Sequence, residues 1–274
     1  MVRQLFLLAV LLAALSARTP RASGGCQYDT QCKGERVCEQ GVCVAPASKE
    51  TPASAPALGG SWIADQRTHC RVWQPAPQPH ASLRWSGACT NGLAQGPGMV
   101  EWVTDGKAVE VARGQWRDGK QTGPGVSTKI NGERYEGEYR DGQANGHGIY
   151  TYANGDRFEG EVRNGQANGR GVSTYANGDR FEGEVRDGQA NGHGIYTWAN
   201  GERYDGQWRE GQRNGHGVNT EANGNRYEGQ WRADKANGHG VFTLADGERY
   251  EGEWHDGCGP QHIFIGRGPS SCPQ

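Results

Sequence analysis

Apolar and polar residues alternate in short segments over the central two-thirds of this chain, without the spacing of a helix. In Tyr135–Arg140 the tyrosines and the glycine would share one face of a strand, and the charged residues would share the other. A second β-rich segment, Ile149–Ala153, precedes the pair Asn154 and Gly155. The pattern predicts an antiparallel hairpin ladder with type I′ turns at Asn-Gly, because this pair tolerates two positive φ angles.

The hairpin pattern repeats every 23 residues. Copies begin at residues 112, 135, 158, 181, 204, 227 and 250, and the last copy is about half complete. A diverged copy begins at Trp85 and carries four extra residues around Asp105–Val111. Each copy buries its apolar residues only against its neighbours, so the repetition itself is architectural. We expect the glycine in mid-strand to leave a slot over which an aromatic ring lies.

The recurring pattern Y-x-G-x-x-x-x-G-x-x-x-G-x-G resembles the MORN (membrane occupation and recognition nexus) repeat, over roughly residues 85–257. The departures are Ala112 for the opening aromatic residue, Asp234 for the mid-repeat glycine, and the enlarged first copy. The resemblance implies an all-β fold, an elongated single-layer antiparallel array of β-hairpins. We expect disulfide-closed caps over residues 59–84 and 258–274, since the end strands of such a sheet expose unpaired edges.

Composition supports a core made of rings rather than aliphatic side chains. The chain has 45 Gly and only 34% hydrophobic residues, but 9 Trp and 10 Tyr. Its net charge of −2 gives no electrostatic reason to expect nucleic acid as a partner.

The N-terminal region predicts export. Arg3 precedes the apolar run Leu5–Leu15, which is too short to span a bilayer, so residues 1–25 are interpreted as a signal peptide. The protein would then reach the bacterial periplasm, the cell surface or the medium. Residues 26–44 are expected to form a disulfide module, and residues 45–58 a Pro/Ala/Ser linker. A lipid anchor at Cys26 is the less favoured alternative.

The cysteines divide into one cluster and two separated pairs. The expected module contains Cys26, Cys32, Cys38 and Cys43, whose three alternative pairings stay open. The cluster lacks the C-x-x-C spacing of zinc ribbons. For the caps we hypothesise the disulfides Cys70–Cys89 and Cys258–Cys272.

No residue set in the repeats predicts catalysis, a metal or a cofactor. The recurring histidines 147, 193, 216 and 239 would lie about 10 Å apart, too far for two of them to share a zinc ion. Glu136 and Glu138 lie about 7 Å apart on one strand face, a separation found in glycosidases. The same acids recur in register with Arg140 and its equivalents, so we interpret them as cross-strand charge ladders on an open face. We expect no enzyme.

Positions that vary between copies suggest a partner surface. They hold Tyr150, Tyr152, Tyr175, Tyr196, Trp198 and Phe242. If the aliphatic and threonine positions face the core, these rings face outward and suit a protein partner or a sugar chain. The alternative is that they only stiffen the sheet. Membrane lipid is disfavoured, because residues 135–249 carry 13 Lys and Arg against 18 Asp and Glu.

The sequence therefore predicts a non-enzymatic extracytoplasmic scaffold that presents an aromatic-bearing sheet to a protein. Binding of envelope polysaccharide is the alternative, and binding of membrane lipid is a weaker one.

Overall fold

The computed structural model describes residues 37–39, 42–44, 60–76, 81–266 and 272. The chain divides into two units, Met1–Ala57 and Leu58–Gln274. In the first unit, strands β1 (Val37–Glu39) and β2 (Val42–Val44) form an antiparallel hairpin that places Cys38 opposite Cys43. The expected signal peptide and linker, and the cysteines at 26 and 32, lie outside the described residues.

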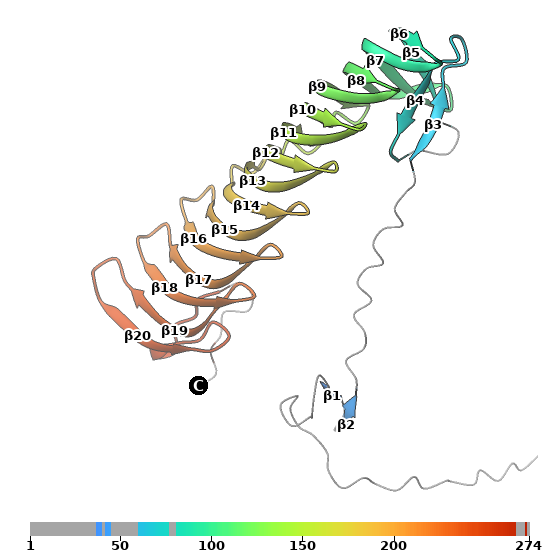
Figure 1. Ribbon diagram of the computed structural model, residues 1–274. Helices are drawn as coiled ribbons and strands as arrows, with labels where there is room; N and C mark the ends of the chain where they lie inside the picture. Colours follow the sequence, from blue (N-terminus) through green and yellow to red (C-terminus); the bar gives the residue numbers. More distant parts are fainter. Residues whose placement is uncertain (1–36, 40–41, 45–59, 77–80, 267–271, 273–274) are drawn as a thin grey trace, which may run out of the picture. The chain divides into compact units, whose positions relative to one another are not determined.

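The second unit is built around one antiparallel sheet in which each strand pairs with the next along the chain (Figure 1). Its strands are β7 (Leu93–Thr104), β8 (Lys107–Arg117), β9 (Lys120–Lys129), β10 (Arg134–Arg140), β11 (Gln143–Thr151), β12 (Arg157–Arg163), β13 (Gln166–Thr174), β14 (Arg180–Arg186), β15 (Gln189–Thr197), β16 (Arg203–Arg209), β17 (Gln212–Thr220), β18 (Arg226–Arg232), β19 (Lys235–Thr243) and β20 (Arg249–Trp254). Among the described strands β20 pairs only with β19, and it lies at the opposite end of the array from β7, so the sheet is open. The predicted all-β hairpin array is confirmed.

Two kinds of turn alternate along the sheet, and the sequence prediction assigned them wrongly. Asp141 and Gly142 have φ values of 52° and 84°, the two positive angles of a type I′ turn. At the predicted site only Gly155 is positive, with φ 91°. There the Asn154 side chain accepts a hydrogen bond from the Asp156 N–H (3.1 Å), which forms an Asx-turn within a longer loop. The type I′ turns therefore belong to the Asp-Gly pairs and their equivalents.

Ring-over-glycine packing forms the core, as the sequence predicted. Gly137 and Gly148 lie opposite each other on β10 and β11. The ring of Tyr135 covers both, and a Cβ atom added to Gly148 would clash with the Tyr135 ring and its hydroxyl. Further copies of the arrangement use the rings of residues 158, 181, 204 and 227, each over its own glycine pair. The face of the sheet that carries these rings is called the aromatic face below.

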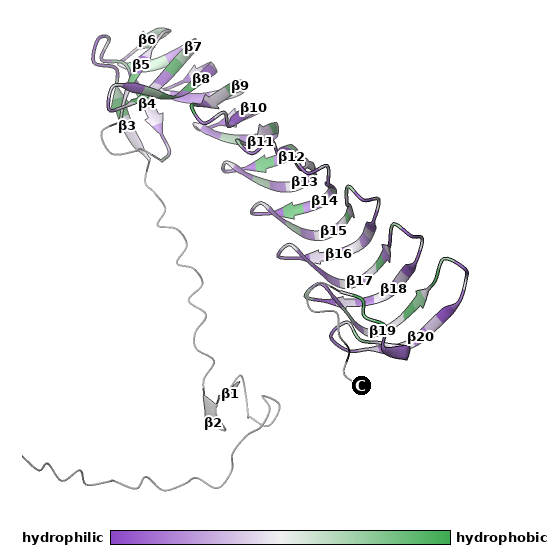
Figure 2. Cartoon of the chain, turned by 180° about the vertical axis from the view of Figure 1, so that it is seen from behind, coloured by the Kyte–Doolittle hydropathy of each residue, from purple (hydrophilic) through white to green (hydrophobic). Residues whose placement is uncertain are grey.

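Apolar residues are otherwise sparse, and Figure 2 shows them as short green segments within the strands, above all at the N-terminal end of the array. The four extra residues of the first copy lengthen β7 and β8 into a longer hairpin, which turns at Asp105 and Gly106.

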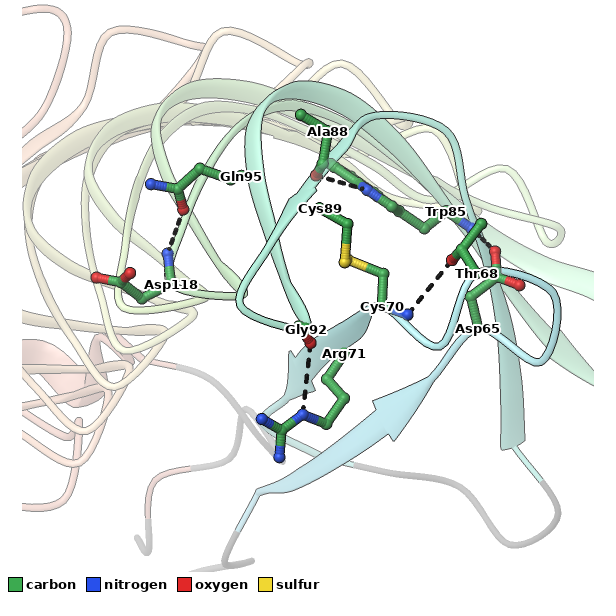
Figure 3. Close-up of a disulfide and its surroundings, with 10 residues drawn as sticks. All are labelled: Asp65, Thr68, Cys70, Arg71, Trp85, Ala88, Cys89, Gly92, Gln95 and Asp118. Atoms are coloured by element: carbon green, nitrogen blue, oxygen red, sulfur yellow. Dashed lines mark hydrogen bonds between the residues drawn. A yellow bond between two sulfur atoms is a disulfide. The ribbon is translucent and has the colours of Figure 1, made fainter.

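The N-terminal cap consists of β3 (Ser61–Ala64), β4 (Arg71–Gln74), β5 (Ala81–Trp85) and β6 (Ala88–Thr90). Strands β5 and β6 pair with β7, and the disulfide Cys70–Cys89 joins the segment before β4 to β6 (Figure 3). The carboxylate of Asp65 accepts hydrogen bonds from the backbone N–H of Trp85 and of Arg67, both at 2.7 Å. These contacts join the β3–β4 segment to β5 and β6, which in turn pair with β7. The hypothesised disulfide is confirmed.

The C-terminal cap folds back over the last strands. The disulfide Cys258–Cys272 is present, as hypothesised, and it encloses a short 3₁₀ turn, η2 (Pro260–His262). The backbone N–H of Ala236 on β19 donates to Ile265 O at 3.0 Å, so the returning segment covers part of the sheet edge. Both ends of the array are thus closed by the same device, a disulfide-bounded loop.

Candidate functional site

The aromatic face has one continuous row of side chains that runs across the strands. Tyr135 lies opposite Tyr150, and Tyr150 lies opposite Phe158 on the next strand. The row continues through residues 173, 181, 196, 204, 219, 227, 242 and 250. The opening aromatic residues and the variable positions therefore alternate in a single row on the same face.

This register corrects the expectation that the variable aromatic residues face away from the core. Phe242 is buried, and four others pack against the core cluster: Tyr150, Tyr175, Tyr196 and Trp198. The invariant aliphatic and threonine residues lie on the other face, because Ile149 is directly opposite Glu136. The expectation of outward-facing rings depended on the condition that the aliphatic and threonine positions face the core, and the register shows that they do not. Tyr152 alone of the six is largely exposed, at 41%.

Two neighbouring hollows open in the aromatic face, and Tyr152 lines both. One has a volume of about 450 Å³ and is lined by Tyr152, Phe158 and Tyr175. It forms where the row holds the small side chain of Ser173 between two phenylalanines. The other has a volume of about 300 Å³ and is lined by Tyr135 and Tyr150 together with Tyr152.

Ring contacts hold this surface in place. Tyr150 and Tyr152 stack with centroids 5.9 Å apart, and the Tyr150 hydroxyl donates to Gly165 O at 2.7 Å. Burial raises the pKa of Tyr150, and it also raises the pKa values of Tyr152 and Tyr175. These hydroxyls therefore remain neutral at physiological pH. Tyr150 already donates its one hydrogen to Gly165 O, so of these three Tyr152 is the exposed hydroxyl that can face a bound partner.

Tyr196 and Trp198 make contacts within the chain that leave less of each side chain available to a binding partner. The Tyr196 hydroxyl donates to Asp179 Oδ2 at 2.7 Å, and its ring lies 4.6 Å from that of Trp198. The guanidinium of Arg213 lies over the Trp198 ring at 6.0 Å.

The face opposite the rings carries the charged residues, and their pairing differs from the predicted cross-strand ladder. Glu159 accepts a hydrogen bond from Arg157, two residues earlier on the same strand, at 2.7 Å. The same pairing recurs at Arg134–Glu136, Arg180–Glu182, Arg203–Asp205 and Arg226–Glu228. Since alternate residues of one strand point to the same side, an i, i+2 pair meets without a neighbouring strand.

The histidines lie on this charged face as well. His193 Nε2 is 3.2 Å from Asp205 Oδ1, and His239 Nε2 is 3.6 Å from Glu251 Oε1. Over the described part of the chain, no group of three His, Cys, Asp or Glu side chains is arranged to hold a metal ion.

A buried arginine is the feature of the aromatic face that sequence reasoning missed. Arg213 is 4% exposed and replaces the alanine of neighbouring copies, such as Ala190 and Ala236. Its guanidinium donates to Asn219 Oδ1 (3.2 Å) and to Asp234 O (2.8 Å), and it lies 4.2 Å from the Trp231 ring. In the sequence, Asp234 stands out only as a departure from the mid-repeat glycine. Comparing all departures across two adjacent copies would have shown the three polar residues together.

The fold and this surface define a β-hairpin repeat protein. The model of the MORN repeat matches seven consecutive segments, which are residues 113–134, 135–157, 158–180, 181–203, 204–226, 227–249 and 250–257. They span more than half of the chain, and the protein belongs to the MORN-repeat family. None of the helices in the described residues is long and apolar enough to cross a membrane.

A search of curated proteins finds no match. Among solved structures, the chain is similar to the TCP domain of SAS-4 (dCPAP) of Drosophila melanogaster in complex with a proline-rich motif of Ana2 (dSTIL), at 17% identity. That match covers 47% of this chain and 77% of the other, with a TM-score of 0.30. The TCP10 domain of Danio rerio CPAP is 9% identical over 64% of this chain and 91% of its own, with a TM-score of 0.22. Scores this low support no statement about function.

Proposed function

We propose that this protein is an exported, non-enzymatic scaffold whose aromatic face binds a protein partner. The observation that carries the proposal is the pair of neighbouring hollows that are both lined by Tyr152. An extended segment of a partner could place one side chain in each hollow and pack against the exposed ring that they share. Rigid rings provide a large contact area at a low cost in conformational entropy, so they dominate many interfaces.

Export is supported by the two disulfides of the array, because disulfides persist in oxidising compartments. The signal-peptide pattern of residues 1–25 agrees with this. A scaffold role is also consistent with the charged face, where a carboxylate pairs with the arginine two residues earlier in each of the copies beginning at residues 135, 158, 181, 204 and 227.

The test is capture of partners by the purified, oxidised full-length protein from an extracytoplasmic extract, followed by direct titration of any captured protein. The test variants are Tyr152→Ala and Tyr175→Ala, and the control is Trp62→Ala. Trp62 is a matched control because it is 42% exposed, close to the 41% of Tyr152, but lies in the N-terminal cap. We expect one protein retained near stoichiometry, weakened at least about tenfold by either tyrosine variant and unchanged by the control. Equal binding by all variants would refute the assignment of the surface.

Polysaccharide is the second candidate, because the stacked rings of Tyr150 and Tyr152 also suit the apolar faces of sugars. Envelope sugar oligomers that displace the captured protein, or bind directly with the same sensitivity to Tyr152→Ala, would favour this alternative.

A further inference from the structure

The copy that begins at residue 112 lacks the ring on which every later copy is built. Ala112 lies in the aromatic row between Val100 and Ser127, where the following copies place Tyr135 and Phe158. A cavity of about 520 Å³ opens at this position. It differs from the hollows beside Tyr152 in that strands of the array and of the N-terminal cap both line it.

The surrounding residues preserve the cavity instead of closing it. Gly114 and Gly125 form the glycine pair of this copy, but the amide of Gln121 lies over them in place of a ring. The Gln121 amide donates to Arg113 O at 3.2 Å, which fixes its position. Other copies have a small alanine where Gln121 stands, such as Ala144. Gln121 therefore covers the glycines without replacing the lost volume of the aromatic ring.

Four elements provide rigid aromatic walls around this space. They are Trp73 on β4, Trp102 on β7, Trp116 on β8 and Tyr139 on β10. Trp102, Trp116 and Tyr139 are buried. The volume falls in the range typical of small-molecule sites, which are mostly apolar and carry a few convergent polar groups.

The polar groups of the cavity include one carboxyl, whose own partner is a neutral serine hydroxyl. Glu110 lines the wall, and burial raises its pKa, although Lys129 and Ser127 act in the opposite direction. Lys129 Nζ lies 2.6 Å from Glu133 Oε2, so its charge is already engaged there. The Tyr139 hydroxyl is also buried. Within the described residues, no other group lies at a distance and angle that would form a hydrogen bond with it.

A carboxyl that lines the same cavity as three indole rings is complementary to an organic cation. The cation would form a charge-assisted hydrogen bond with the carboxylate, and the electron-rich ring faces would stabilise the same charge. We propose that the cavity beside Ala112 binds a small organic amine that carries an apolar ring, with Glu110 as the partner of the ammonium group. The proposal does not depend on the partner of the aromatic face.

The test is isothermal titration of the oxidised full-length protein with tryptamine. Indole provides the same ring without charge, and indole-3-acetate provides it with the opposite charge. We expect tryptamine to bind with one-to-one stoichiometry, at least about tenfold more tightly than indole, and indole-3-acetate to bind least. Absence of saturable tryptamine binding would overturn the proposal.

Two variants separate the contribution of the Glu110 carboxyl to binding from the contribution of the cavity volume. Glu110→Gln keeps the shape of the site, and it should reduce tryptamine affinity to that of indole while leaving indole unchanged. The double variant Ala112→Tyr with Gln121→Ala restores the regular pattern and should abolish binding of both. Tyr152→Ala should bind tryptamine as the native protein does. Equal affinities for tryptamine and indole, unaffected by Glu110→Gln, would overturn the assignment of an amine.

Discussion

The copies beginning at residues 135 and 204 differ in the chemistry of their aromatic faces. In the first, Ala144 lies in the core cluster and the backbone N–H of Gly165 donates to its carbonyl at 2.9 Å. In the second, the equivalent positions hold Arg213 and Asp234, and the equivalent backbone bond is kept at 3.1 Å. The backbone of the hairpin is thus nearly the same, whereas an apolar contact has become an ion pair between the buried Arg213 and the partly buried Asp234.

The comparison teaches that the array tolerates a charge on its aromatic face only when the neighbouring positions change with it. Asn219 stands where Tyr150 stands in the other copy, and it accepts a hydrogen bond from the arginine and donates one to Glu202 at 3.0 Å. Such a network stabilises when every group has a partner, and it is costly when one partner is missing.

The largest expected effect comes from breaking this network. Arg213→Ala would remove the guanidinium that balances the Asp234 charge and donates to Asn219 Oδ1, leaving Asp234 only the backbone N–H of residue 213, so we expect a loss of about 3–5 kcal/mol in the free energy of unfolding. Urea denaturation followed by tryptophan fluorescence would measure it. The triple variant Arg213→Ala, Asn219→Tyr and Asp234→Gly imposes the regular pattern and should recover to within about 1 kcal/mol of the native protein. An Arg213→Ala variant of native stability would show that the three residues are not coupled.

The regular copies should be destabilised for a different reason, because a side chain added at a glycine would fill the space that an aromatic ring occupies. Gly148→Ala would force a methyl group against the Tyr135 ring, and we expect a loss of about 2–4 kcal/mol. Gly165→Ala is the matched control, because its Cβ would meet open space and only its φ of 81° opposes the change. That control should cost about 1 kcal/mol. A larger loss for the control than for Gly148→Ala would contradict the ring-over-glycine account of the core.

These two regions also show what the sequence could predict. The 23-residue period and the glycine–aromatic spacing were sufficient for the hairpin array, since both constraints act within one copy and its neighbour. The pairs Cys70–Cys89 and Cys258–Cys272 followed from the need to close both sheet ends. The predicted orientation of Tyr150 and its equivalents was wrong. Alternation along a strand shows which residues share a face, but it does not show which of the two faces holds the core.

The candidate sites were harder to predict for a related reason. The cavity beside Ala112 and the cluster around Arg213 both arise where residues depart from the repeat pattern. A family pattern describes what the copies share, so it carries no information about such departures. Both involve a residue larger than alanine at the same place in the copy, Gln121 in one and Arg213 in the other. Only the structure shows that one leaves a space open while the other fills it with hydrogen bonds.

A smaller effect is expected from a second buried charge, Asp65 in the N-terminal cap. Burial by itself would raise its pKa, but hydrogen bonds from the N–H groups of Trp85 and Arg67, and the Arg67 guanidinium, lower the pKa to about 2. Because the folded-state pKa is depressed, the stabilisation is complete above about pH 4 and disappears as the pH falls toward 2. Thermal unfolding between pH 5 and pH 2 should show this loss, and Asp65→Asn should remove that part of the pH dependence. An identical pH profile for both proteins would refute the assignment.

The smallest effect is expected on the charged face, where ion pairs are exposed rather than buried. The side chains of Arg157 and Glu159 are 41% and 44% exposed, although their atoms approach to 2.7 Å. Water and salt screen such a pair, so Glu159→Gln should change the free energy of unfolding by no more than about 0.5 kcal/mol. The same substitution at Glu182, in the equivalent pair of the next copy, provides an internal replicate. Urea denaturation at low and high salt would measure both variants. A loss above about 1 kcal/mol in either would mean that the charged face stabilises the array as the aromatic face does, and the contrast with Arg213 would fail.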